Sequence, residues 1–176
     1  MLMYKLLTIG GKEYKLEYTV EASLYKDGID RLINFLGGAF GASAEKELTK
    51  GLSDENKTKV RTDILNNLRS EVLNIPDTAL TLFYAGLLEY HGPDGDQTVL
   101  TKHDAKTLVK TLFHEQDGVE DGISDFASLL QLCTTQMGED GFFKRMGLEK
   151  LMGQNADAKP NRAARRAAAK QPEKNS

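Results

Sequence analysis

Two stretches of this 176-residue sequence repeat apolar residues at the spacing of a single helix face. Both place five such residues at relative positions 0, 3, 4, 7 and 8, namely Leu80, Phe83, Tyr84, Leu87 and Leu88 in the first and Ala105, Leu108, Val109, Leu112 and Phe113 in the second. Because an α-helix turns once every ~3.6 residues, side chains at these positions lie together. The sequence therefore predicts amphipathic helices packed around a common core.

A further helix is expected before Pro76, where Ser53 or Asp54 can cap the N-terminus. Its apolar residues are predicted to face inward: Val60, Ile64, Leu65, Leu68 and Val72. Proline lacks an amide hydrogen and restricts the residue before it. We therefore predict that this helix ends at Pro76 and that the next one begins with Asp77 as its cap.

The helix with the second repeat has its own start and stop signals. Thr101, followed three residues later by Asp104, forms a variant of the capping box, and Asp117-Gly118 ends the pattern. Two more helical segments are predicted at 122–137 and 141–152. The first of these is apolar over a wide arc, which is typical of a central helix or of one covered by a partner.

The first twenty residues follow the two-residue period of a β-strand instead. Polar residues alternate there with Tyr14, Leu16, Tyr18 and Val20. Gly10-Gly11 separates this run from residues 4–9, and two glycines suit a turn whose central positions both need φ > 0. The sequence therefore predicts an N-terminal β-hairpin that packs on the helices.

Glycines dominate the region that follows the hairpin. A helix is predicted over 25–36, with Gly28 as a break near its start and Gly37, Gly38 and Gly41 as its end. The polar stretch from there to residue 56 is predicted to be a loop with one short helix around 44–48.

The net charge of −3 hides an uneven distribution. Residues 155–176 contain six basic and two acidic residues, a net +4, which leaves 17 basic and 24 acidic residues, a net −7, in 1–154. The last segment has no large apolar residue with which to repay the entropy of ordering. We expect a mostly α fold with a small N-terminal β-hairpin (α+β): one domain of five or six helices in 1–153 and a disordered basic tail in 154–176.

The composition, with 40% hydrophobic and 28% charged residues, is that of an ordinary globular domain. We found no apolar run of about 18–20 residues that could cross a bilayer and no signal peptide. The single Cys133 cannot form an internal disulfide. These features predict a protein of a reducing cytoplasm with no membrane partner.

No group of residues has the spacing of a catalytic or metal site. His91, His103 and His114 lie near helix ends and are expected at the surface, without a third ligand at zinc spacing. The acidic loop 117–122 lacks suitable ligands at two positions of an EF-hand. Cys133 lies on an apolar face, where a thiol is usually an inert core group. We therefore expect a protein that is not an enzyme and has no catalytic, cofactor-binding or metal-binding residues.

Two features are candidates for binding a partner. The first is a late cluster of large apolar residues: Phe142, Phe143, Met146, Leu151 and Met152. Methionine and phenylalanine together suit an adaptable groove for partner helices, although core packing is the commoner explanation of such a cluster. The second is a basic stripe that the tail would present if it were helical: Arg162, Arg165, Arg166 and Lys170. It could bind phosphates or an acidic protein, or could only keep the chain soluble.

The two ends of the sequence resemble those of a known family. The opening 4–16, with its Gly-Lys-Glu-Tyr turn, and the Asn-Arg-Ala-Ala-Arg-Arg-Ala ending at 161–167 are similar to those of the tail assembly chaperones of long-tailed bacteriophages of Gram-positive hosts. The resemblance implies a protein of the host cytoplasm that binds the tape measure protein, keeps it soluble and is absent from the mature virion. In that family a ribosomal frameshift often yields a longer product that recruits tail tube protein.

Other classes of function remain open at this stage. A small nucleic-acid-associated protein could use the basic tail as an arm, but the tail lacks aromatic residues for base stacking, which makes nucleic acid an unlikely partner. A structural component of the virion and a homo-oligomer are also compatible with the sequence.

Overall fold

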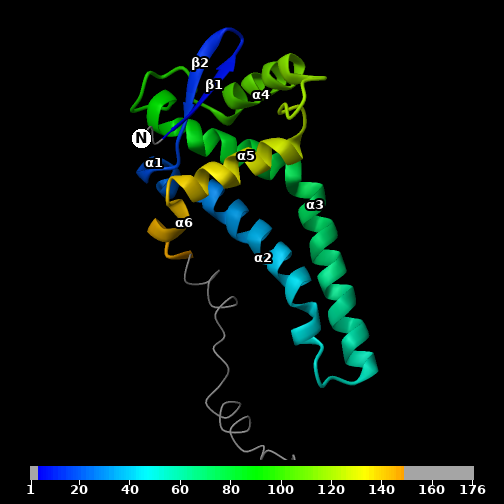
Figure 1. Ribbon diagram of the computed structural model, residues 1–176. Coiled ribbons are helices and arrows are strands. Elements are labelled where there is room, and N and C mark those ends of the chain that lie inside the picture. The colour runs from blue at the N-terminus through cyan, green and yellow to red at the C-terminus, as the bar shows by residue number, and fades with distance from the viewer. Residues whose placement is uncertain (1–3, 149–176) are drawn as a thin grey trace, which may run out of the picture. The chain divides into compact units, whose positions relative to one another are not determined.

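The computed structural model describes residues 4–148, apart from the side chains of 38–48 (Figure 1). In this part the chain is mostly helical, with one antiparallel two-stranded hairpin and six helices, which confirms the predicted fold class. The elements are β1 (Lys5–Ile9), β2 (Lys12–Leu16), α1 (Val20–Leu24), α2 (Lys26–Leu48), α3 (Asp54–His91), α4 (Lys102–Gln116), α5 (Phe126–Glu139) and α6 (Phe142–Arg145). Of the described residues, 4–142 belong to one compact unit and 143–148 to a second. The predicted tail, 154–176, lies outside the described residues.

The N-terminal hairpin forms as the sequence predicts, with one correction. Gly10 and Gly11 have φ angles of 60° and 73°, the left-handed conformation that a tight hairpin turn requires. Leu16 and Tyr18 are fully buried. Val20, however, does not continue the alternation, because β2 ends at Leu16 and the chain turns into α1, where Val20 is 62% exposed.

Helix α2 continues where the sequence predicts its end. It runs from Lys26 to Leu48 through Gly28, Gly37, Gly38 and Gly41, so the prediction of a helix end and a long loop was wrong. A glycine inside a helix costs only about 1 kcal/mol relative to alanine. Helix α2 packs lengthwise against α3, and this tertiary contact outweighs the local cost (Figure 1).

Helix α3 spans 38 residues and contains Pro76, so the predicted end at Pro76 and the predicted cap at Asp77 were both wrong. Ser53 does cap its N-terminus, accepting a hydrogen bond from the Asn56 amide. Figure 1 shows that α3 changes direction along its length, the usual effect of an internal proline. The helix continues because its C-terminal half is held on every side by the fold.

That C-terminal half is the central helix of the unit. Every residue from Thr81 to Leu88 is buried, and α3 packs against the hairpin, α1, α4 and α5. The wide apolar arc of 122–137 predicts a central helix or one covered by a partner, and the central position belongs to α3 instead. Helix α5 begins later than predicted, capped by Asp125, and leaves Ala127 exposed.

A buried tyrosine connects the hairpin to α3 and α5. The Tyr18 hydroxyl donates a hydrogen bond to the Leu82 carbonyl at 3.0 Å, and its amide donates to Asp140 Oδ2 at 2.7 Å. The other carboxylate oxygen of Asp140 accepts from Gln136 Nε2 at 2.7 Å. These bonds satisfy polar groups that would be costly to bury alone.

His91 is a structural residue and not a surface one, which corrects the prediction. It is 5% exposed, and its Nε2 accepts a hydrogen bond from the Lys15 amide at 2.9 Å. Its Nδ1 lies 2.9 Å from Asp96 Oδ2, so the neutral ring carries its hydrogen on Nδ1 and donates it there. His103 and His114 are exposed, as predicted.

A cluster of four charges joins α2, α3 and α4 beside the proline. Asp77 accepts from Arg31 Nη2 at 2.6 Å and from Lys102 Nζ at 2.7 Å. Asp27 lies 3.9 Å from each of the same two cations. The hydrogen bond from Lys102, with the charges of Lys102 and Arg31, holds the pKa of Asp77 below its usual 3.8, although partial burial opposes the shift.

We expect Asp77→Asn to reduce the free energy of unfolding by about 1 kcal/mol at pH 7, a modest figure because the side chains are partly exposed. A carboxyl whose pKa is lowered by folding stabilises the protein above its unfolded pKa, and this stability is lost as the pH falls through the folded pKa. Urea titrations of both proteins at several pH values should therefore show a constant difference in their free energies of unfolding above pH ~5. This difference should disappear below pH ~3.8. A difference that grows in acid would contradict the stabilising role of the ionised Asp77.

Candidate docking surface

The apolar cluster predicted near the end of the domain is not one continuous surface in the described structure. Phe142 is 1% exposed and packs edge-on against Tyr18, with ring centroids 5.9 Å apart, so it is a core residue of the first unit. Phe143 and Met146 are half-buried and belong to the second unit. The remaining candidates lie outside the described residues: Leu151, Met152, Arg162, Arg165, Arg166 and Lys170.

An exposed apolar surface lies elsewhere, on the N-terminal half of α3. Leu65 is 63% exposed, Leu68 37%, Val72 55% and Leu73 71%. The prediction that Leu65, Leu68 and Val72 face inward was therefore wrong. Successive members of this set are three, four and one residue apart, so all four lie on the same side of the helix. We refer to them as the α3 stripe.

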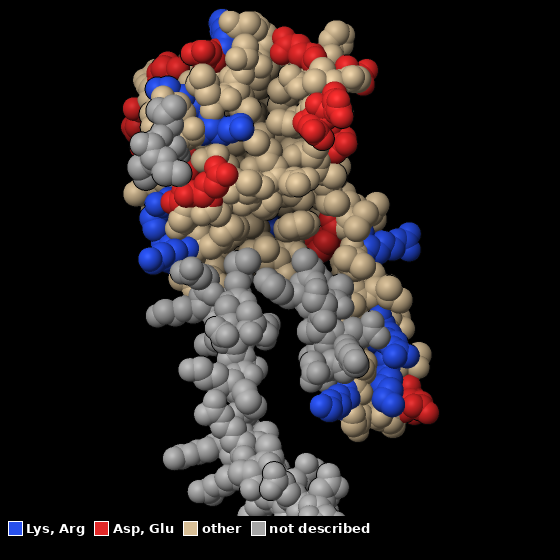
Figure 2. Space-filling view, in the orientation of Figure 1, with Lys and Arg blue, Asp and Glu red and all other residues tan. Residues whose placement is uncertain are grey.

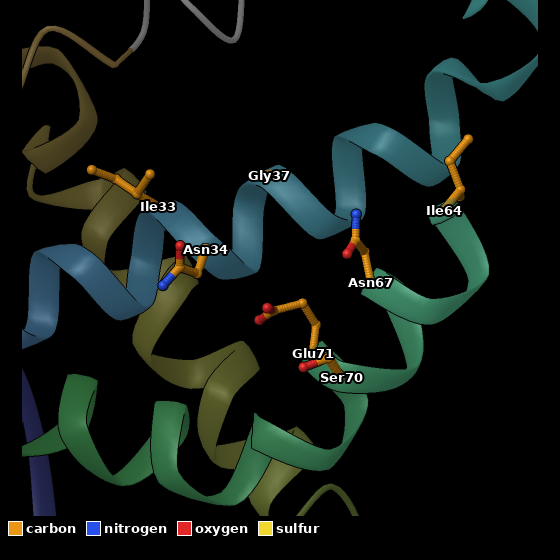
Figure 3. A pocket seen from close by; sticks show the side chains of 7 residues that line it. All are labelled: Ile33, Asn34, Gly37, Ile64, Asn67, Ser70 and Glu71. Carbon is orange, nitrogen blue, oxygen red and sulfur yellow. The ribbon is translucent and has the colours of Figure 1, made fainter. Parts of the chain in front are cut away.

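The reason for this exposure is the polar character of the opposite side of α3. A pocket of about 410 Å³ separates α3 from α2, and Figure 3 shows its lining side chains between the two helices. The lining consists of Ile33, Asn34, Gly37, Ile64, Asn67, Ser70 and Glu71. Within this pocket the polar residues of α3 face its neighbour, which leaves the larger apolar residues on the outside.

A second pocket, of about 430 Å³, lies where α3 meets α4 and the start of α5. Its lining is Pro76, Asp77, Leu80, Lys106, Val109, Lys110, Phe113 and Phe126. Phe113 and Phe126 pack edge to face at 5.1 Å. We call it the α3–α4 pocket; apart from Asp77 and two lysines, its walls are apolar.

The stripe and the α3–α4 pocket are consecutive along one helix. Pro76 follows Val72 by four residues, and Leu80 follows Pro76 by four, which is the spacing that keeps side chains on one side of a helix. From Leu65 to Leu80 the rise is roughly 20 Å at ~1.5 Å per residue, shortened by the change of direction. An apolar track of this length is enough for about four turns of a partner helix.

Helix α5, which packs against the C-terminal half of α3, presents a mainly uncharged surface. Helix α5 contains one charged residue, Glu139, and Figure 2 shows an uncharged region across the middle of the face on which Figure 1 places α5. Carboxylates gather toward the upper part of that view.

Among the side chains that the structure describes, no three of His, Cys, Asp or Glu are grouped closely enough to hold a metal ion. Burial raises the pKa of the Cys133 thiol to about 12, so the thiol is protonated at neutral pH. Among the described helices, none has the length and apolar character needed to cross a membrane.

Comparisons with known proteins found no match: no family model fits the chain, and neither curated proteins nor solved structures resemble it significantly.

Sequence reasoning identified the residues of the stripe but placed them on the wrong side of the helix. The available signal was the pair Asn67 and Glu71, which follow the half-buried Ile64 by three and seven residues and mark the α2 side as polar. Lys106 and Lys110 were not singled out from the sequence. They lie three residues before and one residue after Val109, an apolar residue of the pocket.

Proposed function

We propose that this protein is an assembly chaperone that binds amphipathic helical segments of a client chain. The observation that carries the proposal is the α3 stripe, an unpaired row of apolar side chains that leads into the α3–α4 pocket. Large exposed apolar patches on monomers usually mark interaction sites, and a helix-in-groove arrangement buries such a row.

More specifically, we propose a tail assembly chaperone of a long-tailed bacteriophage, with the tape measure protein as its client. The support for this finer proposal is the resemblance of the two ends, 4–16 and 161–167, to that family. The protein would act in the host cytoplasm and leave before the virion is complete. A longer frameshift product would recruit the tail tube protein.

The physical basis would be many weak contacts. Complete burial of one Leu or Val side chain contributes roughly 1.5–3 kcal/mol, so a few partly buried residues per copy give a weak, reversible contact. A long client with many amphipathic segments would hold many copies at once, and the repeated contacts would raise the overall affinity. Tube subunits could then displace the copies one by one.

Co-expression tests this proposal directly. We expect a tape measure protein from the same genome to be insoluble when produced alone and to appear in the soluble extract, bound to this protein, when the two are produced together. An unrelated acidic helical protein of similar size serves as the control for general effects on solubility. If the tape measure protein stays insoluble and does not co-purify, the proposal is wrong.

A further inference from the structure

Helix α4 carries a row of lysines along the edge of the α3–α4 pocket. Lys102, Lys106 and Lys110 recur every four residues and therefore lie on one side of the helix. Lys102 is already bonded to Asp77. Lys106 and Lys110 line the pocket, are exposed, and form no ion pair with any residue of the described chain.

These two cations are unusual in their surroundings. Residues 1–154 carry 17 basic and 24 acidic residues, so the body is acidic on the whole. The one carboxylate that lines the pocket, Asp77, is occupied by Arg31 and Lys102. The pocket therefore combines an apolar floor with a local positive charge that the protein does not itself compensate.

The two acidic residues of α4 itself are already hydrogen-bonded within the protein. Asp104 accepts from the Thr101 amide at 2.8 Å in the capping box, and Glu115 accepts from the Gly10 amide at 3.0 Å. The next acidic residues, Asp117, Glu120 and Asp121, lie in the loop after α4, seven or more residues beyond Lys110, and charges about one Debye length (~8 Å) apart are screened at physiological salt. Their effect at the two lysines is therefore partly screened. A partner approaching Lys106 and Lys110 encounters mainly positive charge.

We propose that the α3–α4 pocket receives a large apolar side chain of an amphipathic partner helix that carries acidic residues one turn to either side of it. The apolar side chain contacts Val109, Phe113 and Phe126, and the acidic residues pair with Lys106 and Lys110. This inference rests on the proposed client-binding function and names the kind of helix that is selected. Nucleic acid and lipid fit less well, because the pocket has a mainly apolar wall and only two free cations.

Two designed peptides test the selection. Each is a labelled 18-residue helix of Leu, Ala and Gln with one leucine face; one has glutamates flanking the central leucine and the other has lysines there. We expect fluorescence anisotropy to show about tenfold tighter binding of the acidic peptide by the full-length protein. Lys106→Glu/Lys110→Glu should abolish or reverse that preference.

The matched control is Lys5→Glu/Lys12→Glu, which makes the same charge change at two exposed lysines of the hairpin that do not line the pocket. It should keep the preference, and circular dichroism should show that both double variants remain folded.

Equal binding of the two peptides, no binding of either, or an unchanged preference in the pocket variant would overturn the inference. Lysine-dependent binding to phosphatidylglycerol vesicles or to single-stranded DNA without peptide selection would also overturn it. Because the peptides do not depend on the identity of the client, a failed co-expression with the tape measure protein beside a clear acidic preference would refute only the phage-specific assignment.

Discussion

Gly86→Ala is expected to lower the free energy of unfolding by about 2–3 kcal/mol, the cost of overpacking a well-filled core. A Cβ atom at this position of α3 would lie 2.6 Å from Leu16 Cδ1 and 2.8 Å from Tyr18 Cζ. Both side chains are completely buried, so neither can move aside freely. The Gly86 carbonyl also accepts a hydrogen bond from the Glu17 amide at 2.9 Å, which fixes the approach of the hairpin.

Urea denaturation followed by circular dichroism measures this effect, and Gly37→Ala is the matched control. Gly37 lies inside α2, and a Cβ atom there would meet no heavy atom within 4 Å. Alanine is the better helix former by about 1 kcal/mol, so the same substitution should stabilise the protein at this position. A loss of stability in Gly86→Ala together with a gain in Gly37→Ala would support the close approach of the hairpin to α3. Equal changes in the free energy of unfolding would contradict it.

Leu65→Gln/Val72→Gln is expected to abolish most client solubilisation, with at least a tenfold loss of apparent affinity for the tape measure protein. Both side chains are more than half exposed in the α3 stripe, so they contribute little to folding. Glutamine is a good helix former, and surface substitutions of this kind usually change stability by less than about 0.5 kcal/mol. Co-expression solubility and thermal unfolding should be measured on the same preparations.

The control for this variant is Leu24→Gln/Val119→Gln. These two residues are also exposed apolar side chains, 72% and 52% accessible, but lie in α1 and in the loop after α4. If both double variants lose the client equally, general surface hydrophobicity and not the α3 stripe is responsible. If neither loses it, the stripe is not the binding surface.

The locally encoded features of this fold could be predicted well. The capping box of Thr101 and Asp104 is present with both of its reciprocal hydrogen bonds, and the Gly10-Gly11 turn has the expected conformation. Each of these depends on hydrogen bonds and backbone preferences within about four residues. The capping box that begins α5 at Asp125 was missed because the partner at the third helical position is Ser128 and not a carboxylate or an amide.

The candidate site could be predicted only in part. The sequence indicated a surplus of apolar surface and placed it at Phe142 and its neighbours, whereas Phe142 is buried against Tyr18 and the exposed stripe lies on α3. Periodicity shows which residues share a side of a helix, but it does not show which side meets a neighbour. The pocket could not be found, because it joins residues of three helices whose relative placement no local pattern records.

The sequence by itself determined the kind of those elements that carry a clear local signal: a strand period of two, helix periods of three and four, and caps that act over one turn. Tertiary structure decided where helices continue and which sides they bury. Helix α2 passes through Gly37, Gly38 and Gly41 and α3 through Pro76, because packing against distant parts of the chain outweighs a local cost of about 1 kcal/mol per glycine and about 3 for proline. The same packing set polar residues between α2 and α3 and left the α3 stripe facing outward.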